Sequence, residues 1–116
     1  MTTQEIADRL VELCKEGKNV QAEEELYAQN AQSFELDPKN NKQGLENIIA
    51  GTKAAFAGVK EVRKSETTLV GVNNDSFLVR FEMDIAYENG NEMKMDEYGF
   101  YKVENGKVSE EYFFVV

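Results

Sequence analysis

Residues 77–116 read FLVRFEMDIAYENGNEMKMDEYGFYKVENGKVSEEYFFVV, and they carry the clearest structural pattern in the chain. From Phe77 to Tyr87 every second side chain is apolar, which predicts a strand with one buried face. The pairs Asn89-Gly90 and Asn105-Gly106 are typical of tight hairpin turns. The stretch therefore predicts three successive antiparallel strands joined by those two turns.

Residues 59–71 add a fourth, mostly polar strand at the edge of this predicted sheet. The polar residues at 73–75 form the turn that joins it to the next strand. Four strands of about ten residues must twist and coil, so one face of the sheet becomes concave.

Apolar side chains at helical spacing predict three helices before this sheet. They occupy residues 3–16, 19–27 and 45–56. A short strand at residues 33–36, ended by Asp37-Pro38, separates the last two. The helices are the natural cover for the concave face. The expected fold is therefore α+β and cone-shaped, with N-terminal helices packed on a strongly curved antiparallel sheet.

Composition restricts the class of function. The 116 residues suit one domain, residues 1–116, and the formal net charge of −9 argues against binding to nucleic acid or to anionic membranes. The chain has no histidine, and its single cysteine, Cys14, lies on an apolar helix stripe. We therefore expect no zinc site, no Ser or Cys hydrolase with a His base, and no cofactor. The lone cysteine and the absence of a signal peptide or apolar span favour the cytoplasm.

The strand from Met93 to Val103 is not cleanly two-faced. Glu97 lies on the same face as several apolar residues and as Gly99, whose lack of a side chain leaves space. Tyr98 and Phe100 lie on the opposite face. A β-bulge near residues 96–97 would move Tyr98 and Phe100 to the concave face. Without a bulge, Glu97 points into an apolar face and its pKa rises, unless it lies at the rim or pairs with Arg80 or Lys64.

The last strand is apolar on both faces from Tyr112 to Val116. Simple alternation puts Val108, Glu110, Tyr112 and Phe114 on one face. A strand covered by helices on one side only does not need a second apolar face, so we expect a partner subunit packed sheet to sheet. The acidic run Glu23 to Glu25 is expected to be a solvated helix face.

Several segments resemble the SnoaL-like branch of the nuclear transport factor 2-like superfamily. They are Leu26-Tyr27-Ala28, the strand ending at Asp37-Pro38, Gly44-Leu45-Glu46-Asn47-Ile48, and Met95-Asp96-Glu97-Tyr98 through Val103-Glu104-Asn105-Gly106-Lys107-Val108 to Phe113-Phe114. The resemblance covers nearly the whole chain and implies a cone-shaped fold with a deep pocket and often a dimer built through the sheet. It also implies diverse functions, so the fold alone does not give the function.

Ketosteroid isomerase is a relative whose residues can be compared one by one. The resemblance implies that Asp37 takes the place of its catalytic base, although Leu36 replaces an acid beside it. The oxyanion-binding tyrosine of the first helix corresponds to Leu10, and the late acid corresponds to Tyr98. Tyr98 is able to donate a hydrogen bond to an oxyanion, but losing the other donor costs on the order of a hundredfold in rate.

The favoured hypothesis is a homodimer, joined through the sheet, that binds a small apolar molecule between helices and sheet. The expected pocket residues are Tyr27, Phe56, Phe81, Glu97, Phe100 and Glu111, with Asp37 as a further polar group. The alternatives are a cofactor-free isomerase or lyase using Asp37 and Tyr98, and a non-catalytic interaction module whose pocket is filled by side chains. The sequence leaves open whether the protein is an enzyme.

Overall fold

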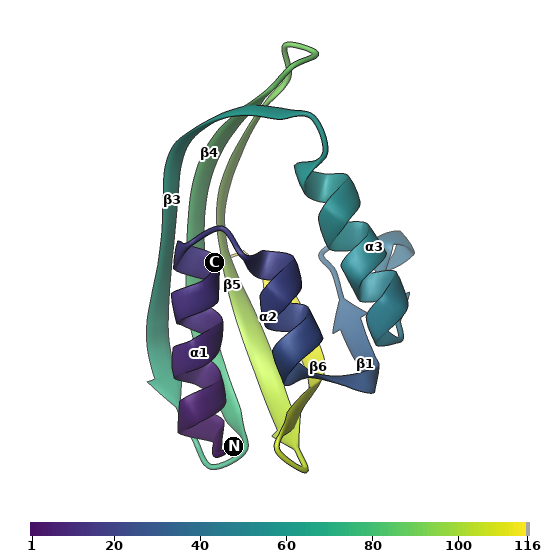
Figure 1. Cartoon of the computed structure of the whole chain (residues 1–116), viewed down its shortest axis with the longest axis vertical. Helices are drawn as coiled ribbons and strands as arrows, with labels where there is room; N and C mark the ends of the chain where they lie inside the picture. Colours follow the sequence, from purple (N-terminus) through teal and green to yellow (C-terminus); the bar gives the residue numbers. More distant parts are fainter. Residues whose placement is uncertain (116) are drawn as a thin grey trace.

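The computed structural model describes residues 1–115 and consists of three helices packed on a curved sheet of six strands (Figure 1). The elements, in chain order, are α1 (Thr3–Lys15), α2 (Asn19–Leu26), β1 (Tyr27–Phe34), the short 3₁₀ helix η1 (Pro38–Asn40), β2 (Lys42–Gln43), α3 (Leu45–Phe56), β3 (Val59–Val72), β4 (Ser76–Tyr87), β5 (Glu92–Glu104) and β6 (Lys107–Phe114). The predicted cone-shaped α+β fold is confirmed. Val116, the end of the predicted last strand, lies outside the described residues.

The first helix begins and ends where its sequence predicts. Thr2 and Glu5 form a capping box, with the Thr2 backbone N–H donating to Glu5 Oε1 at 2.8 Å and the Glu5 N–H donating to Thr2 Oγ1 at 3.1 Å. Gly17, with φ of +76°, follows the helix in a conformation that favours glycine. The stripe of Ile6, Leu10 and other apolar residues is buried against the sheet.

The strand order is β2-β1-β6-β5-β4-β3. All neighbouring pairs are antiparallel except β1 and β6, which run parallel, so the sheet is mixed rather than purely antiparallel. Strand β1 starts at Tyr27, which the sequence placed in the second helix. The early strand is consequently longer than the predicted residues 33–36, and it borders the last strand.

The face of the sheet toward the helices is called the inner face, and the opposite one the outer face. β4 and β5 pair without interruption, with Phe81 opposite Glu97 and Arg80 opposite Tyr98. There is therefore no bulge at residues 96–97. Glu97 lies on the inner face, and Tyr98 and Phe100 lie on the outer face.

A β-bulge does occur in β6. Lys102 pairs with Glu110 and Val103 pairs with Val108, so Ser109 is an extra residue between them. The bulge reverses the alternation, and Val108 shares the inner face with Glu111 and Phe113. The predicted grouping of Val108 with Glu110, Tyr112 and Phe114 is therefore wrong.

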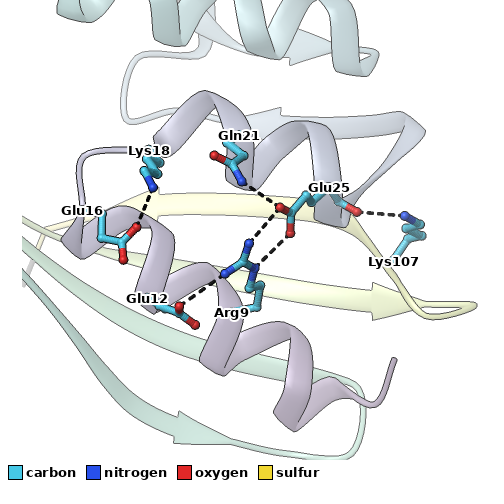
Figure 2. Close-up of polar contacts among 7 residues, drawn as sticks. All are labelled: Arg9, Glu12, Glu16, Lys18, Gln21, Glu25 and Lys107. Carbon is cyan, nitrogen blue, oxygen red and sulfur yellow. Dashed lines mark hydrogen bonds and ion pairs between the residues drawn. The ribbon is translucent and has the colours of Figure 1, made fainter.

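An ionic cluster joins the outward sides of α1 and α2 (Figure 2). The Arg9 guanidinium donates two hydrogen bonds of 3.0 Å to the Glu25 carboxylate, whose pKa these bonds lower to about 2. The backbone carbonyl of Glu25 accepts a 2.9 Å hydrogen bond from Lys107 at the start of β6. Because residues two apart on a helix point in nearly opposite directions, this arrangement turns Glu23 toward the sheet.

Within residues 1–115, no helix is long and apolar enough to cross a membrane.

Candidate functional site

A cavity of about 740 Å³ lies between the helices and the inner face of the sheet. Its walls come from all three long helices and from both the early and the late strands. Much of the lining is apolar and includes Leu10, Ile48, Phe56, Phe81, Met95 and Phe113. The volume falls within the range of roughly 300–1,000 Å³ that small-molecule sites usually occupy.

Tyr27 and Glu111 form a buried polar pair in the cavity wall. Tyr27 is 5% exposed and Glu111 3%, and the Tyr27 hydroxyl donates a hydrogen bond to Glu111 Oε2. The parallel pairing of β1 with β6 brings them together across 84 residues of chain. Burial raises the pKa of Glu111 to about 8, although the hydrogen bond from Tyr27 works in the opposite direction. Burial also raises the pKa of Tyr27 well above its ordinary value.

Glu23 of α2 is a second buried carboxyl in the cavity wall, so the prediction that Glu23 to Glu25 form a solvated helix face is wrong at this residue. It is 7% exposed, and the Thr52 hydroxyl donates to its Oε2 at 2.6 Å. Its Oε1 is buried without a hydrogen-bond partner among the described residues. Burial raises the pKa of Glu23 to about 7. The signal that would have found it is helical spacing, since Glu23 adjoins Ala22 and Leu26 on the buried stripe.

Glu97 is a half-buried third carboxyl, opposite Phe81 on the inner face. Burial, and to a smaller extent the nearby Glu35, raises its pKa to about 7. It pairs with neither predicted partner, because Arg80 binds Asp96 at 2.8 Å and Lys64 binds Glu82 at 2.9 Å.

The space expected beside Gly99 is occupied by aromatic rings. A Cβ at this position would lie 2.8 Å from Cε2 of Tyr101 and 3.0 Å from Cε2 of Phe81. Gly99 is therefore needed for ring packing, and the room for a ligand lies elsewhere in the cavity.

The acidic side chains of the cavity influence one another. Glu23 and Glu35 each raise the pKa of Glu111, and Glu35 also raises that of Glu97. Among the described residues, Lys42 is the single basic side chain in the lining. It lies against Gly51 of α3 and donates a hydrogen bond to the Asn40 carbonyl.

The structure brings five of the eight predicted site residues to the cavity wall and leaves three outside. The five are Tyr27, Phe56, Phe81, Glu97 and Glu111. The expectation for Asp37 is wrong, since it is exposed and its Oδ1 caps η1 by accepting from the Lys39 N–H at 3.1 Å. Tyr98 and Phe100 are on the other side of the sheet, because uninterrupted alternation in β5 points them outward.

Both outer-face aromatics pack against aromatic residues of β6. Tyr98 stacks on Phe114 with 5.7 Å between ring centroids, and Phe100 meets Tyr112 edge to face at 6.2 Å. The base and the donor required by the ketosteroid isomerase comparison, Asp37 and Tyr98, therefore do not meet in the cavity.

The arrangement supports proton exchange and hydrogen bonding near neutral pH. Carboxyl groups whose pKa lies near 7 are present in both protonated and ionised forms, so they can donate or accept hydrogen bonds. Within residues 1–115, no group of three or more His, Cys, Asp or Glu side chains is arranged to hold a metal ion.

Comparison with known proteins identifies relatives over the whole described chain. A sequence profile of the SnoaL-like domain matches residues 1–115. A candidate SnoaL-like polyketide cyclase from Mesorhizobium loti has a TM-score of 0.88 and 34% identity, over 99% of this chain and 100% of that chain. No curated protein matches.

Two further solved structures share the fold at lower identity. A candidate SnoaL-like polyketide cyclase from Jannaschia sp. CCS1 has a TM-score of 0.73 and 17% identity, over 97% of this chain and 83% of that one. A protein with a ketosteroid isomerase-like fold from Catenulispora acidiphila, solved in complex with trimethylamine, has a TM-score of 0.72 and 14% identity, over 98% and 87%.

Proposed function

The chain belongs to the SnoaL-like domain family, as its sequence resemblance indicated, and from this premise we propose that it binds a small, largely apolar molecule in the cavity between helices and sheet. The observation that carries the proposal is the cavity of about 740 Å³ with apolar walls and a few buried polar groups. Such a combination is typical of small-molecule sites, where apolar contacts give affinity and a few polar groups set orientation. A module with a filled pocket would not have this cavity.

A thermal-shift screen of steroids, fatty acids and polyketide-like compounds tests the proposal. A ligand at a hundred times its dissociation constant adds ~2.7 kcal/mol to the free energy of unfolding. Ala55→Trp places a large ring at the cavity wall and should abolish the shift, because Ala55 lines the cavity. Ala50→Trp is the matched control, since Ala50 is an exposed residue of the same helix outside the cavity lining. Equal shifts in the two variants would contradict binding in this cavity.

A second candidate function is cofactor-free proton transfer, as in an isomerase or lyase, with Glu97 as the acid or base. It is favoured by the position of Glu97 on the cavity wall and by its pKa of about 7, because proton transfer is most efficient when the catalytic pKa lies near the working pH. Deuterium exchange at the α-carbon of cyclic ketones, followed by NMR, tests it. Exchange that Glu97→Gln leaves unchanged would eliminate this role for Glu97.

We also propose that two copies associate through the outer face. Its aromatic residues from β1, β5 and β6 are half-buried or exposed, and they stack in a row that includes the Phe34–Tyr112 pair at 4.6 Å. Native mass spectrometry should detect a dimer that Phe100→Lys dissociates. Thr68→Lys, an exposed position on the outer face of β3, should leave it intact. A wild-type monomer at micromolar concentration would contradict the proposal.

The proposal includes a cytoplasmic location, which is compatible with the free, buried Cys14. Cell fractionation with an antibody against the chain tests it.

A further inference from the structure

The lining of the cavity contains more acidic side chains than basic ones. Four glutamates of its lining are buried or half-buried, and Lys42 is the single basic lining residue among those the structure describes. The four are Glu23, Glu35, Glu97 and Glu111, whereas a fifth, Glu66, is exposed and lies 4.0 Å from Lys64. A cavity meant only for a neutral apolar molecule does not need so many acidic groups, because burying each one costs free energy.

The buried carboxyl group of Glu23 is the strongest indication of what the ligand has to supply. Its Oε2 accepts a hydrogen bond from Thr52, while its Oε1 is buried in the cavity wall with no partner among the described residues. A buried oxygen left without a donor is unfavourable, because it has lost its hydrogen bonds to water and gained none in the protein. Glu111 lies close enough to sense Glu23 and already accepts a hydrogen bond from Tyr27. Among the described residues, no basic side chain compensates the burial of either carboxyl group.

We propose that the ligand of this cavity is an organic cation, a protonated amine on an apolar body, whose nitrogen binds beside Glu23 and Glu111. The inference rests on the proposed function and specifies the chemical class of its ligand. An ammonium group has N–H donors and no acceptor, which is what the unpartnered Oε1 of Glu23 requires. The apolar body packs against the Met and Phe side chains of the same cavity, and aromatic rings add a cation–π attraction. An anionic ligand is repelled by the same acidic groups.

Binding of a cation has a consequence for protons. The titratable groups that line the cavity are Cys14 on α1, Glu23 on α2, Tyr27 on β1, Glu35, Lys42 on β2, Glu97 on β5 and Glu111 on β6, together with the exposed Glu66 on β3. A bound ammonium favours the ionised form of nearby carboxyls, so it lowers pKa values that burial had raised. Amine binding near pH 7 therefore releases protons, and the binding enthalpy depends on the ionisation enthalpy of the buffer.

Three probes that share one apolar body separate the possibilities. They are 1-adamantylamine, 1-adamantanol and adamantane-1-carboxylate, which carry a cation, a neutral hydroxyl and an anion on the same cage. In isothermal titration calorimetry at pH 7 we expect the amine to bind at least tenfold more tightly than the alcohol. We expect the carboxylate to bind more weakly than both, and proton release with the amine alone.

Neighbouring glutamates provide a matched pair of variants. Glu23→Gln should weaken amine binding about tenfold and affect alcohol binding much less, because the alcohol carries no charge. Glu24→Gln removes the same charge from the same helix at an exposed position outside the cavity lining, and it should leave both affinities unchanged. Glu111→Gln is a second cavity variant that tests the same site if Glu23→Gln does not fold.

The outcomes distinguish the two proposals. If the alcohol and the amine bind equally well and Ala55→Trp blocks both, the cavity binds small molecules but the preference for cations is refuted. If Glu24→Gln weakens the amine as much as Glu23→Gln does, the attraction is a general effect of net charge and the assigned site is wrong. If none of the probes binds and the broader screen also finds no ligand, the proposed function itself fails.

Discussion

The two faces of the sheet show how a shift of one residue along a strand changes the environment of a carboxyl group. Asp96 and Glu97 are neighbours in β5, yet an outer-face contact with Arg80 lowers the pKa of Asp96, while burial on the inner face raises that of Glu97 to about 7. The outer face carries stacked aromatics and exposed ion pairs. The inner face carries the cavity and its buried carboxyls. Function in this chain therefore depends on which side of the strand a residue occupies more than on its place along it.

The largest effect is expected from removing the bulge in β6. Without Ser109, regular alternation cannot keep Val108 on the same face as Glu111 and Phe113. Either Val108 moves from the inner to the outer face, or Glu111 and Phe113 do. We expect a loss of more than about 4 kcal/mol in the free energy of unfolding, measured by urea denaturation. Ser109→Ala keeps the residue count and removes only a 3.3 Å hydrogen bond to the Lys102 carbonyl, so it should cost about 1 kcal/mol or less. Equal losses would mean that the bulge does not control the alternation.

Adjacent phenylalanines on opposite faces give the next largest difference. Phe113 packs on the inner face against Tyr101 and Phe81, whereas Phe114 is 37% exposed on the outer face. Phe113→Ala should lower the free energy of unfolding by about 2 kcal/mol and Phe114→Ala by less than about 1 kcal/mol. Chemical denaturation at low protein concentration measures the free energy of unfolding of both variants. A Phe114→Ala loss as large as that of Phe113→Ala would show that the outer face is covered as fully as the inner one.

Two glycines within strands allow a similar test of packing. Gly99→Ala forces a methyl group against Tyr101 and Phe81, and we expect a loss of about 1–3 kcal/mol in thermal or chemical denaturation. Gly71→Ala in β3 meets no atom within 4 Å and should be neutral or stabilising by up to about 1 kcal/mol. The reverse order would show that the rings beside Gly99 move aside easily.

The smallest effect concerns pH and the pair Glu110 and Glu111. Glu111 has a folded pKa of about 8, above the unfolded value of about 4.3, so the folded state holds its proton more strongly. Its contribution to stability is complete below about pH 4.3 and is lost as the pH rises through 8. Glu111→Gln cannot ionise and should be more stable than the wild type at pH 9 by more than about 1 kcal/mol.

The outer-face variant Glu110→Gln is the control for this pH effect. We expect it to keep the wild-type fall in stability between pH 5 and pH 9. If Glu111→Gln shows the same fall, burial of Glu111 is not its cause.

The sequence predicted the helices and strands more accurately than it predicted which face of the sheet each side chain occupies. Regular alternation from Phe77 to Tyr87 and the Asn105-Gly106 turn were sufficient for the sheet, and both turn residues have positive φ, as a tight hairpin of this type requires. The boundaries of the third helix, Leu45–Phe56, were also predicted. These features depend on local residue preferences, which a sequence displays directly.

The assignment of faces failed where two arrangements have nearly equal local preference. In β5 both faces carry aromatic residues, so hydrophobicity alone did not decide between Glu97 and Tyr98 for the cavity. Nothing local marks Ser109 as a bulge, because it arises from pairing with β5. Glu23 was missed because three consecutive glutamates suggest solvent, although its spacing from Ala22 and Leu26 places it on the buried side of α2. The Arg9–Glu25 contact turns α2 in the same way.

The parallel pairing of β1 with β6 also has a kinetic consequence. β3, β4 and β5 are joined by short turns and can pair early, whereas the Tyr27–Glu111 contact closes a loop of 84 residues. We therefore expect the cavity to be completed late in folding, after the hairpins have formed. A ligand that needs the finished wall then slows unfolding and leaves the rate of folding nearly unchanged.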